Sequence, residues 1–233
     1  MKIETFPDPA AAAGAAALFL AAASRAATSV RGRFVVALSG GSTPWLMLRA
    51  LAHEELPWNA IQVLQVDERV APAGHPDRNL THLHENLLGH TPLRPEQVHA
   101  MPVEAQDLET ATANYAHNIA DLAGSPPVLD LVHLGLGTDG HTASLVPGDP
   151  VLDITEADVA LTGTYQGRRR MTLTYPVLNR ARQVLWLVTG AEKAAAFQRL
   201  QAGDVSIPAG RIRQDIAVVF ADRAAAPSPS GRG

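Results

Sequence analysis

The chain has 233 residues, of which 46% are hydrophobic and 18% are charged, and its formal net charge is −4. This is enough apolar material for one sizeable core, and no shift in composition indicates a second one. The negative charge excludes a generally basic nucleic-acid-binding surface, and the absence of cysteine excludes disulfides and Cys-based zinc sites. We therefore expect residues 1–223 to form a single cytoplasmic domain with no nucleic-acid partner.

The first predicted element is an Ala-rich helix over residues 10–27. Asp8 is a suitable N-cap for this helix, and Pro9 suits its first position. Glu4 and Asp8 give the preceding segment the wrong charge for a signal peptide. The apolar stretch is also shorter than a membrane span. We expect a surface helix of a soluble protein and no membrane partner.

Short apolar runs recur along the chain and alternate with stretches typical of helices. The runs predict buried strands at residues 33–38, 61–66, 129–134, 184–188 and 216–220, with a further strand at 171–174. Helices are predicted at residues 44–53, 79–88, 110–123 and 192–201. This alternation predicts a three-layer, Rossmann-like α/β fold, with a mostly parallel sheet covered by helices on both faces. The Pro- and Gly-rich segment 224–233 is predicted to be a disordered tail.

A small polar loop follows the first of these strands. It reads Ser39-Gly40-Gly41-Ser42 and leads through Thr43 and Pro44 into the next helix. Glycines let the backbone approach a ligand closely, Ser42 or Thr43 is suited to cap the helix, and a helix N-terminus attracts anions. The loop lacks the lysine of a P-loop. A plain strand-to-helix turn is the alternative interpretation.

A charged triplet, Asp67-Glu68-Arg69, follows the second strand. A carboxylate is suited to sugar hydroxyls and a guanidinium to phosphate, although most such triplets are solvated turns. Asn79 is predicted to cap the next helix. Within that helix, His82 and His84 point to nearly opposite sides, so we do not expect them to share a metal ion.

The segment after the third strand contains the pattern G-x-G-x-x-G from Gly135 to Gly140. A dinucleotide site would need a long helix after this pattern, and Pro147 and Gly148 stop any such helix early. The loop instead places His141 beside Asp139 among glycines. A histidine near neutrality can take a proton from water, and a carboxylate can orient it. The chain contains no G-x-S-x-G motif, which would indicate a serine hydrolase.

Taken together, these segments resemble the 6-phosphogluconolactonase family. The similar motifs read LSGGSTP, DER, GLGTDGHTASLVPG, RMTLTYPVLN and LVTGAEKA, and the resemblance extends from about residue 34 to residue 220. Two positions depart from the family pattern. Arg78 stands where serine is usual before Asn79, and Val146 stands where phenylalanine is usual.

The resemblance implies an α/β fold shared with glucosamine-6-phosphate isomerase/deaminase. It also implies hydrolysis of 6-phosphoglucono-1,5-lactone in the pentose phosphate pathway without a required metal. We expect no other cofactor, and we expect a monomer or a weak homo-oligomer. By this resemblance His141 is the general base and Asp139 its partner. The residues implied in substrate and phosphate binding are Ser39, Gly40, Gly41, Ser42, Asp67, Arg69, Arg170 and Lys193. Of Arg168, Arg169, Arg170 and Arg211, we expect at most one to contact phosphate.

Two alternatives stay open at this point. The related isomerase/deaminase family places a glutamate where this chain has Val146, and valine cannot move a proton, so lactone hydrolysis is favoured. A sugar-phosphate-binding regulator without catalysis would keep the loop Ser39–Ser42 and lose the base. This chain keeps both Asp139 and His141.

Overall fold

The computed structural model describes residues 1–227 and contains two sheets. The larger sheet has seven strands in the order β1-β10-β9-β6-β2-β3-β5, and all of its neighbouring strands run parallel. Its strands are β1 (Lys2–Phe6), β2 (Phe34–Leu38), β3 (Ile61–Gln65), β5 (Val98–His99), β6 (Leu131–Leu134), β9 (Val184–Val188) and β10 (Ala217–Asp222). A three-stranded antiparallel sheet consists of β4 (Asp67–Arg69), β7 (Val159–Leu161) and β8 (Arg170–Leu173).

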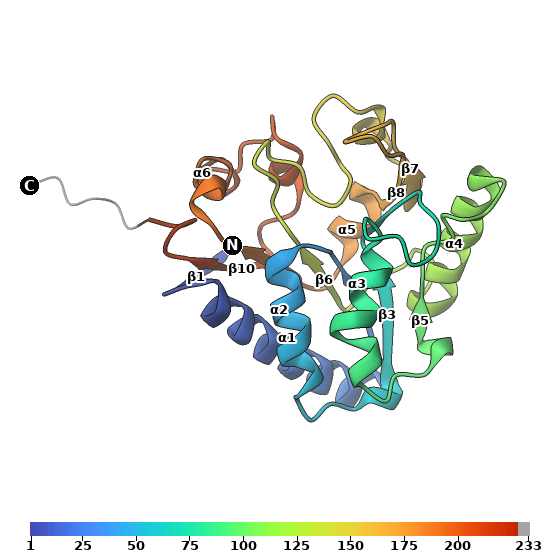
Figure 1. The fold of residues 1–233 in the computed structure, drawn as a ribbon, viewed down its shortest axis with the longest axis horizontal. Coiled ribbons are helices and arrows are strands. Elements are labelled where there is room, and N and C mark those ends of the chain that lie inside the picture. The colour runs from blue at the N-terminus through green and yellow to red at the C-terminus, as the bar shows by residue number, and fades with distance from the viewer. Residues whose placement is uncertain (228–233) are drawn as a thin grey trace, which may run out of the picture.

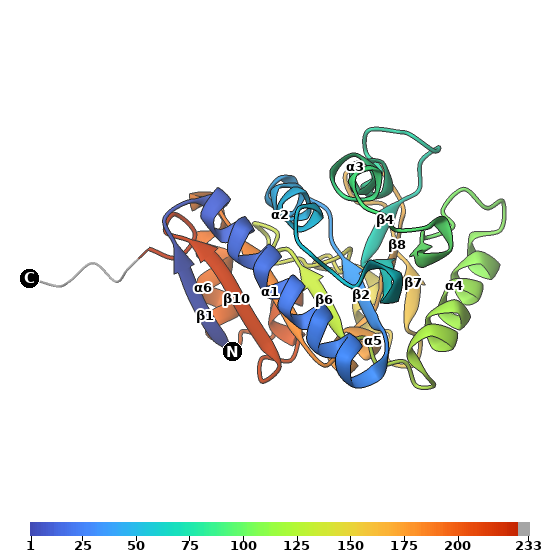
Figure 2. The ribbon, with the colours of Figure 1, turned by 90° about the horizontal axis from the view of Figure 1, so that it is seen from below.

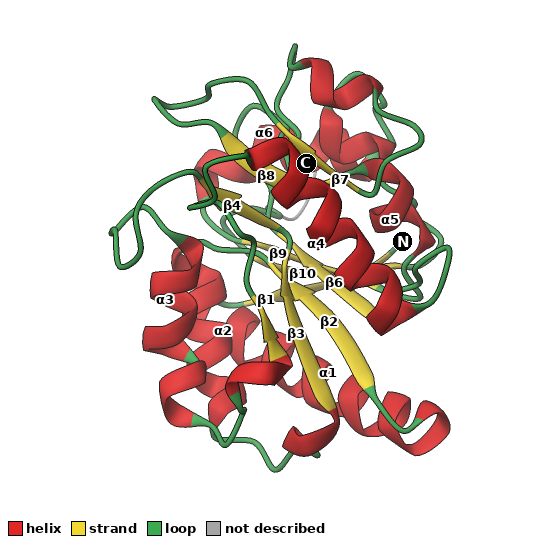
Figure 3. Ribbon diagram, turned by 90° about the vertical axis from the view of Figure 1, so that its right-hand side faces the viewer, coloured by secondary structure: helices red, strands yellow, loops and turns green. Residues whose placement is uncertain are grey.

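Helices cover both faces of the large sheet (Figures 1 and 3). The helices are α1 (Pro9–Arg31), α2 (Ser42–Ala52), α3 (Asn79–Asn86), α4 (Leu108–Ala123), α5 (Tyr175–Arg180) and α6 (Ala194–Gln201). One hydrophobic cluster joins α1, α2 and α3 to one face of the sheet, and a second joins α4, α5, α6 and the small sheet to the other face. The predicted three-layer α/β arrangement is confirmed.

The central strands form because their side chains are apolar on both faces. Every residue of β2, β6 and β9 is buried, which is the pattern of a parallel strand covered on both sides. The edge strand β1 has only two apolar residues, Ile3 and Phe6, and is largely exposed. It was not predicted, and neither were the short strands β4, β5 and β7.

Helix α1 begins where the sequence predicts, since Asp8 caps it by accepting a hydrogen bond from the N–H of Ala11 at 2.8 Å. It extends to Arg31, however, and its 23 residues and mean hydropathy of 1.5 in the most apolar window make it long and apolar enough to cross a membrane. The expectation that this segment is too short was therefore wrong. The helix nevertheless buries one side, including Ala13, Ala17 and Leu20, against the sheet (Figure 2).

The first and last described strands, β1 and β10, pair with each other at one edge of the sheet. After β10 the backbone turns at residues 223–226, and Ala225 is fully buried in the core. The predicted tail was placed from residue 224, whereas residues 224–226 belong to this turn. Residues 228–233 of the predicted tail lie outside the described residues.

Candidate active site

The site lies where the order of strands in the large sheet reverses. From β2 the chain continues outward to β3 and β5, and it then returns to place β6 on the opposite side of β2. Loops that follow two such neighbouring strands leave in opposite directions and open a crevice between them. A cavity of about 430 Å³ occupies this crevice, lined by both loops and by segments after β3 and β9. Its volume is within the usual range of small-molecule sites.

The loop after β2 forms one wall of the cavity. Gly41 is the N-cap of α2, with φ at 130°, and no side chain caps the helix. The prediction that Ser42 or Thr43 caps it was therefore wrong, because the helix already begins at Ser42. An uncapped N-terminus leaves backbone N–H groups for a ligand, and these attract an anion. At Gly40 a Cβ atom would lie 2.1 Å from Asn79 Oδ1, so a larger residue would have to displace the Asn79 side chain.

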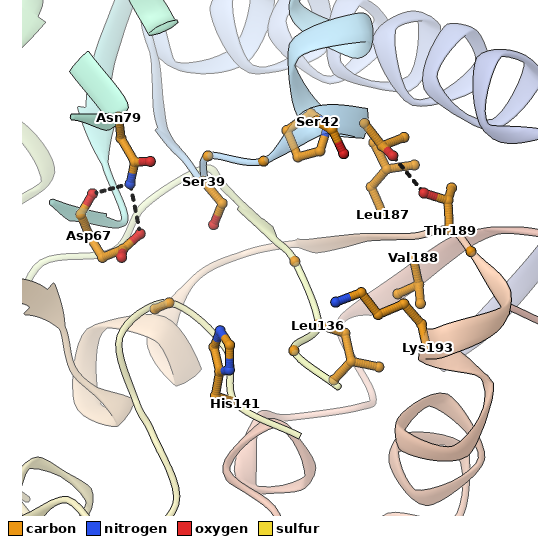
Figure 4. Close-up of a pocket in the computed structure, with 18 of the residues that line it drawn as sticks. Ser39, Ser42, Asp67, Asn79, Leu136, His141, Leu187, Val188, Thr189 and Lys193 are labelled. Atoms are coloured by element: carbon orange, nitrogen blue, oxygen red, sulfur yellow. Dashed lines mark hydrogen bonds between the residues drawn. The ribbon is translucent and has the colours of Figure 1, made fainter. Parts of the chain in front are cut away.

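A buried histidine on β6 binds the backbone of this loop. His133 on β6 is fully buried and its Nδ1 accepts a hydrogen bond from the N–H of Ser39 at 3.3 Å. Burial lowers the pKa of His133 to about 3, so the imidazole is neutral at physiological pH. The hydroxyl of Ser39 faces the cavity in Figure 4 and has no hydrogen-bond partner among the described residues. An unpaired hydroxyl at a cavity wall is suited to a polar ligand.

His141 projects into the cavity from the loop after β6 (Figure 4). Its Nδ1 lies 2.6 Å from Asp139 Oδ1, and its backbone N–H donates to the same oxygen at 3.1 Å. Its side chain is 24% exposed. A carboxylate on Nδ1 holds the proton on that nitrogen and leaves a lone pair on Nε2. The pair therefore has the arrangement of a general base with its orienting group.

The surroundings of Asp139 favour its charged form. Burial raises the pKa of Asp139, but the hydrogen bonds and charge of His141 outweigh burial, so that the pKa lies below its ordinary value. The carboxylate is thus available to stabilise an imidazolium. The loop is close-packed here, since a Cβ atom at Gly137 would lie 2.1 Å from His141 Nδ1.

The loop from Gly135 to Gly148 contains no helix among the described residues and has only an isolated bridge between Thr142 and Leu145. The absence of a long helix after Gly140 agrees with the prediction that Pro147 and Gly148 stop such a helix early. Val146 is buried and is not part of the cavity wall.

Asp67 and Arg170 form a buried polar group on the far wall. Asp67 Oδ2 accepts a hydrogen bond from Ser144 Oγ at 2.6 Å and lies 3.9 Å from Arg170 Nη1. Asn79 Nδ2 donates to the backbone oxygen and to Oδ1 of Asp67. Burial lowers the pKa of Arg170, and the charge of Asp67 opposes this effect. Asp67 therefore fixes its neighbours as well as lining the cavity.

Arg69 reaches the cavity beside Asn79. Its Nη1 donates to Asn79 Oδ1 at 2.9 Å and to the backbone oxygen of Asp77 at 2.8 Å. The Nε atoms of Arg69 and Arg170 lack hydrogen-bond partners among the described residues. Two cations with unused donors at one wall are suited to an anionic ligand.

Glu68, the middle residue of the charged triplet, caps α3. Its carboxylate is fully buried and accepts hydrogen bonds from the N–H groups of Asn79 and Leu80, each at 2.8 Å. The prediction that Asn79 caps this helix was therefore wrong. Arg78, which departs from the family pattern, is also buried and lies 3.1 Å from Glu68 through its Nε. It supplies the charge that a buried carboxylate requires.

Lys193 reaches the cavity from the segment after β9. It ends the short 3-10 helix Ala191–Lys193 and extends its side chain toward the centre of the cavity (Figure 4). The segment is held by Asp222, whose carboxylate accepts the N–H of Gly190. Thr189 also lines the cavity and its hydroxyl lies 2.6 Å from that of Thr43 on α2.

Nine of the ten predicted site residues line this one cavity, and Asp139 adjoins it through His141. Among the four candidate arginines, only Arg170 is part of the wall. Arg168 binds Asp77, Arg169 lies near Glu109, and Arg211 packs over the Tyr175 ring. Sequence reasoning missed the positions of Asn79 and Thr189. Thr189 directly follows a buried strand, and that position was a usable signal.

Within residues 1–227, no group of three or more His, Asp or Glu side chains is arranged to hold a metal ion. His82 contacts Glu85, the backbone oxygen of Pro76 and the ring of Trp45, whereas the neighbouring His84 is exposed.

Comparison with known proteins identifies the family. The sequence profile described as "Glucosamine-6-phosphate isomerases/6-phosphogluconolactonase" matches residues 7–220. The 6-phosphogluconolactonase of Synechocystis sp. is 39% identical over 180 residues, which cover 76% of this chain and 75% of the relative. That of Mycobacterium tuberculosis is 35% identical over 98% of this chain and 99% of the relative.

Solved structures agree with the sequence comparison. The crystal structure of 6-phosphogluconolactonase from Thermotoga maritima superposes with a TM-score of 0.85 at 26% identity, covering 95% of this chain and 98% of that one. From the matched profile, the similar relatives and the shared fold, we conclude that the chain belongs to the glucosamine-6-phosphate isomerase/6-phosphogluconolactonase family.

Proposed function

We propose that this protein hydrolyses 6-phospho-D-glucono-1,5-lactone to 6-phospho-D-gluconate, the lactone-opening step of the oxidative pentose phosphate pathway. The observation that carries the proposal is the His141–Asp139 pair, which faces a cavity lined by Lys193, Arg69 and Arg170. A base and a cationic pocket in one cavity suit a substrate that has an ester at one end and a phosphate at the other. The relatives named above are 6-phosphogluconolactonases.

Binding begins with the phosphate. In our proposal the phosphate docks at the N-terminus of α2, where the loop Ser39–Ser42 supplies backbone N–H groups and Lys193 supplies a positive charge. One of the two arginines in the wall, Arg170 or Arg69, adds a second cation. Anchoring the phosphate at this end brings the lactone carbonyl near His141.

The chemical step uses water. His141 Nε2 takes a proton from a water molecule as the water oxygen bonds to C1 of the lactone. The carbonyl oxygen becomes an oxyanion, which the backbone N–H groups of the glycine loop are suited to stabilise. The C1–ring oxygen bond then breaks, and the proton on His141 passes to the ring oxygen, which becomes a hydroxyl. Asp139 stabilises the imidazolium between these two transfers.

We also propose that the protein acts in the cytoplasm as a monomer that needs neither a metal nor another cofactor. A single chain supplies a complete cavity wall, with base, cations and helix N-terminus together. All the proton transfers in the mechanism are assigned to His141, so no step requires a metal-bound water.

The test is hydrolysis of freshly generated 6-phosphogluconolactone in the presence of EDTA, followed by proton release. The spontaneous rate without protein is subtracted. We expect rapid hydrolysis of the lactone and no ammonia release from glucosamine-6-phosphate, assayed in parallel. Ammonia release without lactone hydrolysis would instead assign the deaminase activity, and binding of both compounds without turnover would assign a regulator.

A further inference from the structure

Tyr165 lies behind the candidate base, on the turn that joins β7 to β8. Its N–H donates to the backbone oxygen of Arg168 at 2.9 Å, and the N–H of Arg168 donates back at 3.2 Å. The two residues between them, Gln166 and Gly167, have φ values of 50° and 77°. Positive φ at both central positions is typical of a two-residue hairpin turn. Tyr165 is not part of the cavity wall.

Three contacts connect the Tyr165 side chain to the site. Its hydroxyl donates to Asp139 Oδ2 at 3.3 Å. Its ring meets the His141 ring edge-on, with centroids 5.5 Å apart and planes at 67°. The guanidinium of Arg170 lies over the same ring, 5.0 Å from its centroid. The ring therefore lies between the base and a cation of the cavity wall.

The hairpin that carries Tyr165 is fixed on both sides. Gln166 Oε1 accepts a hydrogen bond from Arg170 Nη2 at 3.3 Å. Arg168 donates from Nε to Asp77 Oδ2 at 3.0 Å, and its Nη2 lies 3.1 Å from His75 Nε2. These contacts join the hairpin to the wall of the cavity and to the loop before α3. The tyrosine is thus held in place by groups other than the pair it contacts.

We propose that Tyr165 is a positioning residue that acts through Asp139. The two oxygens of that carboxylate have separate partners, since Oδ1 binds the backbone N–H and Nδ1 of His141 while Oδ2 binds the tyrosine hydroxyl. A carboxylate bonded at both oxygens cannot rotate away from the imidazole, and the tyrosine ring limits rotation of the imidazole itself. This role rests on the proposed function of His141 as the base.

The tyrosine is suited to this role because its hydroxyl stays a donor. Burial and the neighbouring Asp139 charge raise the pKa of Tyr165 above its usual value. The hydroxyl therefore keeps its proton throughout the pH range in which a histidine acts as base. No proton transfer by Tyr165 is required.

The test measures the effect of Tyr165→Phe in two backgrounds, the wild type and the Asp139→Ala variant. Phenylalanine keeps the ring contacts and removes only the hydroxyl. We expect kcat for lactone hydrolysis to fall about ten-fold, the size of effect of one hydrogen bond to a charged group, with KM unchanged. In an Asp139→Ala background the same change should have no further effect, because the tyrosine then has no carboxylate to orient.

Tyr115→Phe is the matched control. Tyr115 is buried and is not part of the cavity wall, and its hydroxyl donates to the backbone oxygen of His99 at 3.0 Å. This variant should keep wild-type kcat and KM, and thermal unfolding followed by circular dichroism checks that each variant is folded.

The outcomes separate the two claims. If the wild type hydrolyses the lactone and Tyr165→Phe has the same kcat, the role of Tyr165 is overturned and the proposed function stands. The same holds if Tyr165→Phe lowers kcat equally in the wild-type and Asp139→Ala backgrounds. A rise in KM alone would also overturn it, since that result would make Tyr165 a substrate contact. A wild type that does not hydrolyse the lactone would overturn the proposed function first, and this inference with it.

Discussion

Gly137 lies so close to His141 that no larger residue fits between them, because a Cβ atom at position 137 would lie 2.1 Å from Nδ1 of the imidazole and 2.6 Å from Asp139 Oδ1. The glycine is therefore a condition for the hydrogen bond between the candidate base and its partner. Glycine is required at position 137 because it has no side chain, and not because of its backbone conformation, since its φ is not in the left-handed region.

Gly137→Ala should displace the imidazole and break its bond to Asp139. We expect kcat to fall about 10²-fold or more, approaching the loss from removing the base. NMR of ¹⁵N-labelled histidine rings checks the cause, since the Nδ1–H signal of His141 should change. Gly135→Ala is the comparison in the same loop, because its Cβ atom meets nothing within 4 Å. An unchanged His141 signal in Gly137→Ala would contradict the argument.

His141→Ala should lower kcat by about 10²–10⁴-fold, the usual contribution of a general base, with little change in affinity for the product 6-phosphogluconate. Initial rates with freshly generated lactone measure the first quantity and calorimetry the second. The control is His84→Ala, which removes an exposed imidazole from α3. A normal rate in His141→Ala would remove this residue from the mechanism.

Lys193→Ala should raise KM by about ten- to one-hundred-fold and leave kcat nearly unchanged. The phosphate is held alike in the ground state and the transition state, so losing its ligand weakens binding of both equally. The chain has only one other lysine, the exposed Lys2, which pairs with Glu4, and Lys2→Ala is the matched control. Steady-state kinetics that show the same KM for both variants would exclude Lys193 as a phosphate ligand.

Arg78→Ser, which restores the usual residue of the family, should destabilise this particular chain. It leaves the buried Glu68 carboxylate without its cation, and breaking such a pair lowers the free energy of unfolding by about 3 kcal/mol. Urea unfolding measures the change. Arg94→Ala, which removes an exposed pair with Glu96, should cost less than about 1 kcal/mol. Equal losses in the two variants would show that the buried pair contributes no more than a surface pair.

His133 predicts a loss of stability in acid. The folded state keeps it neutral down to a pKa of about 3, whereas in the unfolded chain its pKa is close to 6.5. Below pH 6.5 the unfolded state thus binds a proton that the folded state does not. The free energy of unfolding should fall by up to about 1.4 kcal/mol per pH unit between pH 6 and pH 3 from this residue alone.

The measurement for His133 is urea unfolding at pH 7 and pH 5 in the wild type and in His133→Asn. Asparagine keeps an acceptor near the N–H of Ser39 but does not titrate. The wild type should lose more stability between the two pH values than the variant does. Identical slopes in the two proteins would show that His133 does not carry this pH dependence.

The parts of the fold that were predicted correctly depend on local signals. Runs such as residues 184–188 are apolar on both faces, and Asp8 with Pro9 marks the start of α1. The edge strand Lys2–Phe6 was missed because it has no continuous apolar run and is largely exposed. Of the small antiparallel sheet, β8 was predicted, but β4 and β7 were missed. These short strands are defined by pairing partners far apart in the chain, such as Glu68 with Met171.

In the site too, features with a local sequence signal were predicted, and features that depend on contacts between distant residues were not. The glycine loops and the position of His141 after a strand could be identified from the sequence, since the carboxyl ends of parallel strands share one edge. The contact of Tyr165 with Asp139 joins residues 26 positions apart through a hairpin turn that was not predicted. The burial of Arg78 against Glu68 was also unpredictable, because a local charge pattern does not show which side chains become enclosed.

The pairing of β1 with β10 has a consequence for how the chain acquires its structure. Among the described strands, β1 comes first along the chain, and its only sheet neighbour, β10 at residues 217–222, comes last. Co-translational folding can assemble the central strands earlier, but β1 cannot pair at this edge until residues 217–222 have been synthesised. A nascent chain stalled before residue 217 would therefore expose Lys2–Phe6 as an unpaired strand. Such an unpaired edge is prone to aggregate unless a chaperone binds it.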